Sequence, residues 1–305
     1  MDLINNEVKI HYGDEELIMG RIYVVATPIG NLSDISKRAL ETLKSSSLIL
    51  AEDTRHSLKL LNHYNIRNKL MSYHKFNERE RCEYIVNKII DEDIDVSLIS
   101  DAGTPCIQDP GYLIINHARK MNIEILAIPG PSAAISALSV CGINIDEFAF
   151  YGFLPRDKSS RCDKLEKIKN TNIDVFVLYE SPKRIKFLLE DLIKFFKNSE
   201  VCVCSDISKI HEKYYFGNVC EVYEKIINND KSELGEYVVI VHNLEYIETK
   251  ECEDKISTEA LIIDEMMKED ISFKEAIIRV SKKHSLGKNE CYRASLKIKE
   301  IFHDI

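Results

Sequence analysis

Short apolar runs, rich in β-branched residues, alternate with amphipathic stretches along most of this chain. The first run, RIYVVAT at residues 21–27, is followed by apolar residues at helical spacing, and the pattern then repeats. Strands separated by stretches of helix length are typical of a mostly parallel sheet with crossover helices. The sequence therefore predicts an α/β fold.

The pattern predicts two consecutive units. In the first, strands are expected at 21–27, 48–51, 96–100 and 123–128, and helices around residues 38–43 and at 57–63, 78–90 and 111–121. The second begins with a helix of small residues at 132–140. Its strands are expected at 148–152, 174–179, 201–205, 213–216 and 236–241, and its helices at 159–169, 182–196 and 219–228.

The length of 305 residues suffices for two domains that each bury a core. We predict an N-terminal α/β domain at 18–130 with a mostly parallel sheet, and a second α/β domain at 131–244. A charged segment at 245–255 follows, and residues 256–305 are expected to form a small helical tail. Within this tail, Ser272 and Glu275 predict a capping box, and Gly287 separates two helices.

Composition and spacing exclude several classes of protein. No run approaches the ~20 apolar residues that span a bilayer, and the polar, acidic start is unlike a secretory signal, so we expect a cytoplasmic protein. A formal net charge of −9 argues against indiscriminate adhesion to nucleic acid, but leaves RNA open as a substrate of a local basic face. Nine cysteines without a CxxC pair predict no metal site, and Cys202 and Cys204 are expected as reduced, half-buried thiols on one strand face.

Glycine and proline gather directly after the predicted strands. The segments are ATPIGNLSD (26–34), SDAGTP (100–105), IPGPSA (128–133) and YESP (179–182). Ligands of open α/β sheets bind beyond the carboxyl ends of the strands, where glycine lets them approach the backbone. One such loop alone is usually a turn, but several at successive strand ends predict a ligand site. Ser181-Pro182 and Asp109-Pro110-Gly111 also predict helix starts.

Known nucleotide and hydrolase motifs are absent from these loops. The first strand is not followed by GxGxxG, and the chain contains neither GxxxxGK[ST] nor GxSxG. Dehydrogenase, P-loop NTPase and α/β-hydrolase functions therefore lose their main support.

The order of the loops and their neighbours resembles one family. The matching segments are VATPIGNLSDIS (25–36), AEDTRHS (51–57), SYHKFNE (72–78), LISDAGTPCIQDPGY (98–112), IPGPSA, GFLPR (152–156), YESPKR (179–184) and, in the tail, KNECYRA (288–294). They resemble the bacterial ribosomal RNA small subunit methyltransferase I family, which has the tetrapyrrole methylase fold. The chain departs from the family pattern at SDISKIHEK (205–213) and at Leu234-Gly235. These departures affect segments that are expected to contact RNA in the family, and not the donor site.

This resemblance implies an S-adenosylmethionine-dependent enzyme that methylates the ribose 2′-oxygen of a decoding-centre cytidine in 16S rRNA. It also implies a donor site between two α/β domains, a homodimer, and the small ribosomal subunit or its RNA as partner. The expected donor-binding residues are Pro28, Ser100, Asp101, Ala102, Gly103, Thr104, Pro105, Ser132, Tyr179 and Glu180. Asp101 is the strongest of these, with a helix-capping role as the alternative.

Methyl transfer requires donor and acceptor in line and the loss of a proton from the acceptor hydroxyl, without a metal or a covalent intermediate. Glu180 is our first candidate for the general base, followed by Asp53 and Asp101. On this hypothesis, Glu180→Gln lowers turnover and leaves donor affinity nearly intact.

The expected RNA contacts are mostly basic. They are Asn31, Arg55, His56, Arg156, Lys158, Arg161, Lys183 and Arg184. The fork of Arg55 suits a phosphate, and the alternative is an internal pair with Asp53. Basic runs are more often solvated helix faces, but these begin at strand-end loops. Phosphate contacts would make binding fall steeply with salt.

Two other functions stay open. One is a methyltransferase of the same fold that acts on a tetrapyrrole or another small molecule. The first loop, TPIGNLSD, differs from the GxGPGD-like loop expected of tetrapyrrole enzymes and disfavours it. The other is a non-catalytic RNA-binding protein of ribosome assembly, which a titration with S-adenosylmethionine distinguishes from an enzyme.

Overall fold

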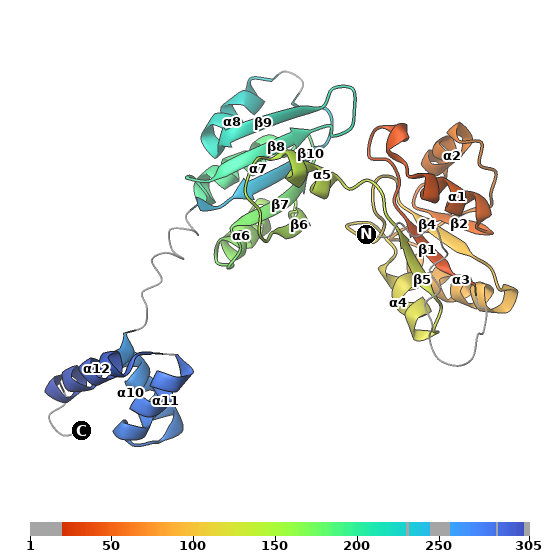
Figure 1. The fold of residues 1–305 in the computed structure, drawn as a ribbon. Helices are drawn as coiled ribbons and strands as arrows, with labels where there is room; N and C mark the ends of the chain where they lie inside the picture. Colours follow the sequence, from red (N-terminus) through yellow and green to blue (C-terminus); the bar gives the residue numbers. More distant parts are fainter. Residues whose placement is uncertain (1–19, 230–231, 245–256, 285, 302–305) are drawn as a thin grey trace. The chain divides into compact units, whose positions relative to one another are not determined.

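The computed structural model describes residues 20–229, 232–244, 257–284 and 286–301, and Figure 1 shows its ribbon. The chain divides into two compact units, residues 1–246 and residues 247–305. In its described part, the first unit carries two β-sheets with their helices, and the second carries helices. None of the helices in these ranges is long and apolar enough to cross a membrane. The segment predicted as a charged linker lies outside the described residues.

The first sheet has five strands, all parallel, in the order β3-β2-β4-β1-β5. The strands are β1 (Ile22–Val25), β2 (Leu48–Ala51), β3 (Leu70–Ser72), β4 (Val96–Ile99) and β5 (Ile125–Ile128). β2 and β4 are buried at every position, as expected of parallel strands covered on both faces. β3 is missing from the sequence-based prediction, because three half-buried residues are too few to form a pattern.

The helices of this sheet divide between its two faces. α1 (Lys37–Ser45) and α2 (Thr54–His63) contribute to one hydrophobic core, and α3 (Glu78–Glu92) and α4 (Tyr112–Lys120) to the other. The chain therefore leaves the neighbouring strands β1 and β4 toward opposite faces (Figure 1). Their carboxyl ends form the topological switch point of the sheet, where doubly wound folds bind ligands.

The second sheet is mixed, in the order β6-β7-β10-β8-β9. It contains β6 (Ala149–Phe153), β7 (Val175–Glu180), β8 (Glu200–Ser205), β9 (Lys213–Asn218) and β10 (Tyr237–His242). Only β6 and β7 pair in parallel, and the other described pairs are antiparallel. α6 (Lys158–Lys169), α7 (Ile185–Phe195) and α8 (Val219–Ile227) share a core with one face, and α5 (Ala133–Val140) packs on the other.

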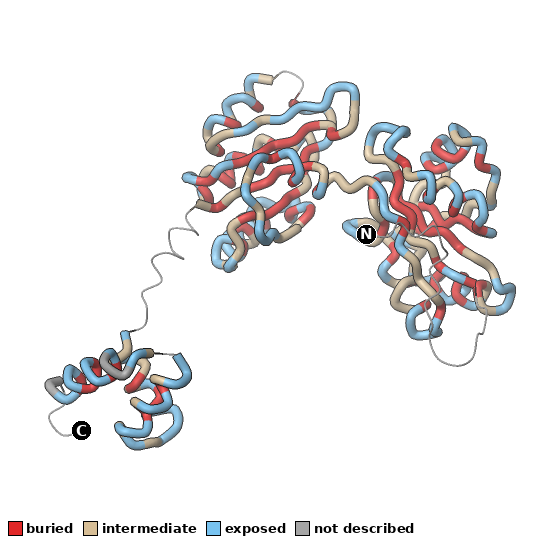
Figure 2. Tube along the Cα trace, viewed as in Figure 1, coloured by how far each residue is buried: buried red, intermediate tan, exposed pale blue. Residues whose placement is uncertain are grey.

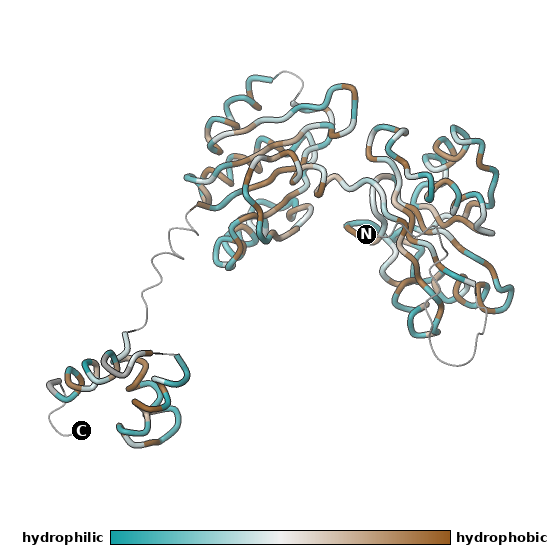
Figure 3. Tube along the Cα trace, viewed as in Figure 1, coloured by the Kyte–Doolittle hydropathy of each residue, from teal (hydrophilic) through white to brown (hydrophobic). Residues whose placement is uncertain are grey.

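The interior of both sheets is buried and apolar, as Figures 2 and 3 show along the strands. Cys202 and Cys204 lie in the core under α5, with their sulfur atoms 3.5 Å apart. They share one strand face as predicted, but both are fully buried, so the expectation of half-buried thiols is wrong. The reason is that α5 covers this face of the strand. The alternation of residues along a single strand does not reveal which helix packs against it.

The helical tail contains α10 (Thr258–Glu269), α11 (Phe273–Lys283) and α12 (Lys288–Ile301). Its buried core consists of Ile262, Ala276, Val280, Ala294 and Ile298. The capping box of Ser272 and Glu275 is confirmed at the start of α11. Gly287 lies between α11 and α12, as predicted. The α/β fold with a helical tail is thus confirmed, and the division of the first unit at residue 130 stays a prediction.

Two predicted helix caps are wrong. α7 begins at Ile185 and not at Pro182, because the hydroxyl and the N–H of Ser181 both donate to the Glu180 carboxylate and the next residues form a turn. α4 begins at Tyr112 after Gly111, whose φ is 137°. Asp109 does not cap this helix, because the N-cap residue is Gly111 and the helix has no side-chain capping hydrogen bond.

Candidate functional site

The loops after β1 and β4 are joined into one platform at the switch point. Thr27 and Gly103 exchange backbone hydrogen bonds, with N···O distances of 2.9 and 3.0 Å. The buried Thr27 hydroxyl donates to the Ser100 carbonyl at 3.1 Å. Gly103 has a φ of +81°, a left-handed conformation in which a side chain is strained. The glycine of SDAGTP is therefore required by the geometry of this junction.

The loop after β5 lies against the same platform. A Cβ atom on Gly130 would lie 2.9 Å from the Ala26 Cβ, so the two loop backbones approach too closely for a side chain. The Thr104 hydroxyl lies 3.5 Å from the Pro131 carbonyl. Ser132 is the N-cap residue of α5, but its side chain makes no capping hydrogen bond and can serve a ligand.

Three carboxyl groups gather at the ends of β2 and β4. Asp101 Oδ1 accepts the N–H of Asp53 at 3.1 Å, and the Glu52 carboxyl group lies close to Asp101. Burial raises the pKa of Glu52, with further increases from the nearby charges of Asp109 and Asp101. Burial and the Asp101 charge also raise the pKa of Asp109 to about 6, although the nearby Ser100 side chain acts to lower it. Asp101 Oδ2 has no hydrogen-bond partner among the described residues.

Glu52 and Asp109 are absent from the sequence-based site. The sequence position of each residue could have identified it. Glu52 directly follows the β2 strand, and Asp109 belongs to the same segment as SDAGTP, eight residues after Asp101. Across the described ranges, no group of three or more His, Cys, Asp or Glu residues is arranged to hold a metal ion. The arrangement suits proton transfer, because one carboxyl group has a pKa near neutrality beside another that is ready to accept hydrogen bonds.

Tyr179, at the end of β7, is attached to the third loop. Its hydroxyl oxygen accepts the N–H of Ala134 at 3.2 Å and so caps α5 in place of Ser132. Its ring packs edge-on against Phe150 and Phe153, with centroid distances of 4.9 and 5.6 Å. Burial raises the pKa of the Tyr179 hydroxyl, which keeps it neutral. Tyr179 thus holds the loop that carries Ser132.

Glu180 has a structural environment that argues against a role as base. Its side chain is buried, Oε2 lies 2.6 Å from Arg184 Nη2, and Oε1 accepts the N–H of Ser181 at 2.7 Å. Arg184 also donates to the Leu154 carbonyl at 3.1 Å. A carboxylate that is buried, ion-paired and hydrogen-bonded on both oxygens is poorly placed to receive a proton.

We therefore expect Glu180→Gln to act mainly on stability. Removing one charge of a buried ion pair costs about 3 kcal/mol, so thermal unfolding should shift to a clearly lower temperature. Turnover by the protein that remains folded should stay close to that of the wild type. Glu233→Gln, which breaks the exposed pair with Lys186, is the matched control and should leave unfolding unchanged. A stable Glu180→Gln protein with strongly reduced turnover would restore Glu180 as the base.

Arg55 forms an internal ion pair with Asp53, which was the predicted alternative to its binding a phosphate. Asp53 caps α2 and lies 3.0 Å from Arg55 Nη2. The hydrogen bonds from Arg55 lower the pKa of Asp53 to about 2, which makes it a weak base. Arg55 and His56 are exposed, and Asn31 caps the short 3-10 helix η1 (Leu32–Asp34). Arg55 thus keeps an exposed guanidinium, which can also meet an RNA phosphate.

The basic residues of the second sheet fall into two groups. Arg156, Lys158 and Lys183 are exposed and stay candidates for RNA contacts. Arg161 is buried, and its Nε and Nη2 both lie 2.8 Å from Asp191 Oδ2. This buried ion pair argues against Arg161 as an RNA contact. Arg184 is likewise engaged, by Glu180.

Comparisons with known proteins agree with the fold. The family described as Tetrapyrrole (Corrin/Porphyrin) Methylases matches residues 21–223. Among solved structures, a uroporphyrin-III-C-methyltransferase from Thermus thermophilus superposes with a TM-score of 0.52 at 16% identity, over 76% of this chain and 98% of its own. Another structure of that enzyme, complexed with S-adenyl homocysteine, gives a TM-score of 0.52 at 14% identity, over 75% and 100% of the two chains. At these identities the likeness shows the fold alone.

Curated relatives are much more similar in sequence. A protein from Buchnera aphidicola subsp. Schizaphis graminum is 37% identical over 92% of this chain and 97% of its own length. One from Escherichia coli O157:H7 is 35% identical over 91% and 95%, and one from Thermotoga maritima is 40% identical over 74% and 100%. All three are named ribosomal RNA small subunit methyltransferase I.

Proposed function

This chain belongs to the tetrapyrrole methylase family and, within it, to ribosomal RNA small subunit methyltransferase I, and from this premise we propose that its switch-point loops bind S-adenosylmethionine for methylation of 16S rRNA. The acceptor we propose is the ribose 2′-oxygen of a decoding-centre cytidine. The observation that carries the proposal is the junction of three Gly/Pro loops with the Asp101 carboxylate at the carboxyl ends of β1, β4 and β5.

Similarity favours RNA over a tetrapyrrole as the acceptor. The relatives named as ribosomal RNA enzymes are 34–40% identical to this chain, whereas the uroporphyrin enzymes are 13–16% identical. A non-catalytic role is disfavoured because all three donor loops are intact and linked by hydrogen bonds. We further propose the small ribosomal subunit or its RNA as substrate, a cytoplasmic homodimer, and domains at 18–130, 131–244 and 256–305. Family resemblance supports these points.

The residues at the switch point fit S-adenosylmethionine, which supplies a methyl group on a sulfonium centre. Asp101 Oδ2 can accept a hydrogen bond from an amine or a hydroxyl group, since it has no partner in the described chain. Ser132 and the amino end of α5 can receive a carboxylate. Gly103 and Gly130 leave the backbone open for close approach. The flanking donor-site residues are Pro28, Ser100, Ala102, Thr104, Pro105 and Tyr179.

For the proton of the acceptor hydroxyl we propose Asp109 in place of Glu180. Asp109 lies near Asp101 and Ser100 at the end of β4, and its pKa of about 6 is close to that of an effective base near neutral pH. Asp53 is a weaker candidate, since its pKa is about 2. Asp101 is assigned to the donor.

The pH dependence of turnover tests Asp109. A base works in its deprotonated form, so kcat/KM of the wild type should fall about tenfold per pH unit below pH 6, where Asp109 becomes protonated. Asp109→Asn should lower kcat by about 10²-fold or more at pH 7.5 and leave the affinity for S-adenosylhomocysteine nearly unchanged. Asp157→Asn, at an exposed helix cap, is a carboxylate control. Wild-type turnover and pH profile in Asp109→Asn would exclude this role.

The function itself is tested with labelled donor and small ribosomal subunits from a strain that lacks this protein. We expect one methyl group per subunit, on the ribose of a 16S rRNA cytidine, after nuclease digestion and nucleoside analysis. Label on a base, on protein, or nowhere contradicts the proposal.

A further inference from the structure

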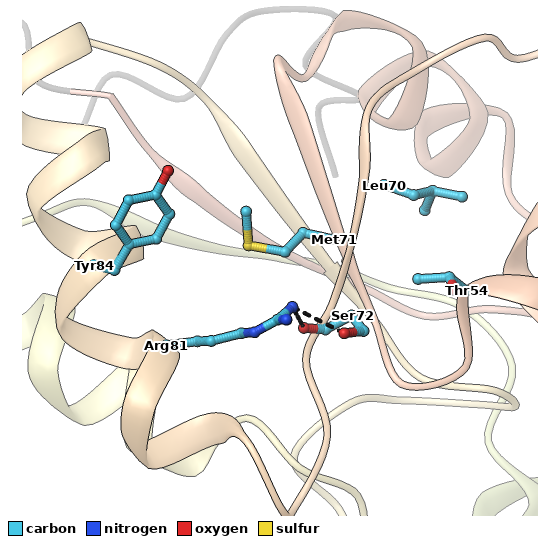
Figure 4. Close-up of a pocket in the computed structure, with 6 residues that line it drawn as sticks. All are labelled: Thr54, Leu70, Met71, Ser72, Arg81 and Tyr84. Carbon is cyan, nitrogen blue, oxygen red and sulfur yellow. Dashed lines mark hydrogen bonds between the residues drawn. The ribbon is translucent and has the colours of Figure 1, made fainter.

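A pocket of 480 Å³ lies beside the edge strand of the first sheet, apart from the donor loops. It is lined by Thr54, Leu70, Met71, Ser72, Arg81 and Tyr84. In Figure 4 the side chains of Arg81 and Tyr84 extend from α3 toward those of Met71 and Ser72 on β3, with Thr54 on the other side. This volume is in the range of pockets that hold small ligands. None of the site residues that were predicted from the sequence lines this pocket.

The pocket opens at the same edge of the sheet as the donor loops. Ser72 ends β3, and Thr54 begins α2 directly after β2, so both mark carboxyl ends of parallel strands. β2 is the neighbour of β4, whose loop carries Asp101, and adjacent strands lie about 4.8 Å apart. Asp53, next to Thr54, is hydrogen-bonded to Asp101 itself. A nucleotide bound in this pocket would thus lie about 10 Å, or two strand spacings, from the loop after β4 that carries Asp101.

The polar groups of the pocket are held in place by their neighbours. Arg81 Nη1 donates to the carbonyl and the hydroxyl oxygen of Ser72, the latter at 2.8 Å. Asn77 Nδ2 lies 3.3 Å from each of the same two oxygens and 3.2 Å from the His74 ring. Arg81 Nε and Nη2 have no partner in the described chain. The guanidinium group is thus fixed at one corner and keeps two donor groups for an anion.

Aromatic surface completes the pocket. Tyr84 is 57% exposed, although it lines a cavity, and Phe76 of the adjacent loop is 95% exposed. The exposed Arg55 adds a second cation beside Thr54. Proteins recognise unstacked RNA nucleotides by stacking bases on aromatic rings and by pairing phosphates with arginine. An apolar wall, a tyrosine ring and a fixed arginine form this combination.

We propose that this pocket holds one unstacked nucleotide of the RNA substrate, with its base against Tyr84 and Met71 and its phosphate at Arg81. The inference rests on the proposed function and adds the place where RNA enters the first sheet. It also gives a role to SYHKFNE (72–78), whose residues support the pocket and its rim.

Kinetics with Tyr84→Ala test the proposal. Loss of one base-aromatic stack should raise KM for undermethylated small subunits about tenfold, while kcat, the melting temperature and the affinity for S-adenosylhomocysteine stay near wild type. Arg81→Gln should raise KM similarly and reduce its salt dependence, because the cation at the phosphate is lost. Phe216→Ala, an exposed aromatic on β9, is the control and should keep the wild-type KM. An unchanged KM in Tyr84→Ala overturns the proposal.

A photocrosslinker at position 84 identifies the occupant directly. With small subunits, we expect crosslinks to 16S rRNA that a crosslinker at position 216 does not give. Crosslinks only to ribosomal protein, or none above the control, overturn the nucleotide proposal. These outcomes are distinct from failure of the proposed function, in which the wild-type protein transfers no methyl group to rRNA.

Discussion

Replacing Asp101 by alanine should weaken the binding of S-adenosylmethionine about 10–100-fold, because the donor loses a charge-assisted hydrogen bond worth ~1.5–3 kcal/mol. In the carboxylate of Asp101, Oδ1 accepts the N–H of Asp53. The other oxygen, Oδ2, has no partner among the described residues and is available to the donor. Titration calorimetry with S-adenosylmethionine and with S-adenosylhomocysteine measures the loss. Turnover at subsaturating donor should fall by the same factor.

Asp95→Ala is the matched control for this substitution. Asp95 lies at the amino end of the same strand, β4, where it accepts the N–H of Arg21 at 3.0 Å. It should leave donor affinity unchanged, because ligands of this fold class bind at the carboxyl ends. Wild-type donor affinity in Asp101→Ala, or an equal loss in both variants, contradicts the assignment of the donor site.

Arg161→Ala should destabilise the protein without a selective effect on RNA binding. The substitution leaves Asp191 buried with the exposed Lys194 as a remaining cationic partner among the described residues, and breaking a buried pair costs ~3–5 kcal/mol. We expect a large fall in the melting temperature, and low yield of folded protein.

The exposed Arg156 provides the comparison. Arg156→Ala removes a solvated side chain, and its backbone carbonyl still accepts the hydrogen bond from Arg161 Nη1. It should keep the wild-type melting temperature and weaken RNA binding, with a shallower dependence on salt. A stable Arg161→Ala protein with selectively weakened RNA binding would show that the original prediction for this residue holds.

The strands and loops of the fold follow from local sequence. β-branched runs that end in Gly/Pro segments place β1, β4 and β5 and their loops within a few residues, because strand burial and turn formation depend on neighbouring residues. The strand order β3-β2-β4-β1-β5 needs the structure. It is what places SDAGTP beside ATPIGNLSD at the switch point.

The roles of single charged residues were less accessible from sequence. Glu180 and Arg161 look like site residues because they follow motif loops, yet each is buried with an oppositely charged partner in the fold. Arg161 pairs with Asp191, thirty residues away, which no local pattern indicates. Asp109 resembles a helix cap in sequence, and only the fold shows its carboxyl group beside Ser100 and Asp101.

A crystal structure with S-adenosylhomocysteine tests the central claim most directly. We predict that the ligand lies at the carboxyl ends of β1, β4 and β5, with a polar atom within hydrogen-bond distance of Asp101 Oδ2 and further contacts to Gly103 and Ser132. A ligand bound elsewhere on the chain, or one at these loops that leaves Asp101 without a contact, would contradict the account.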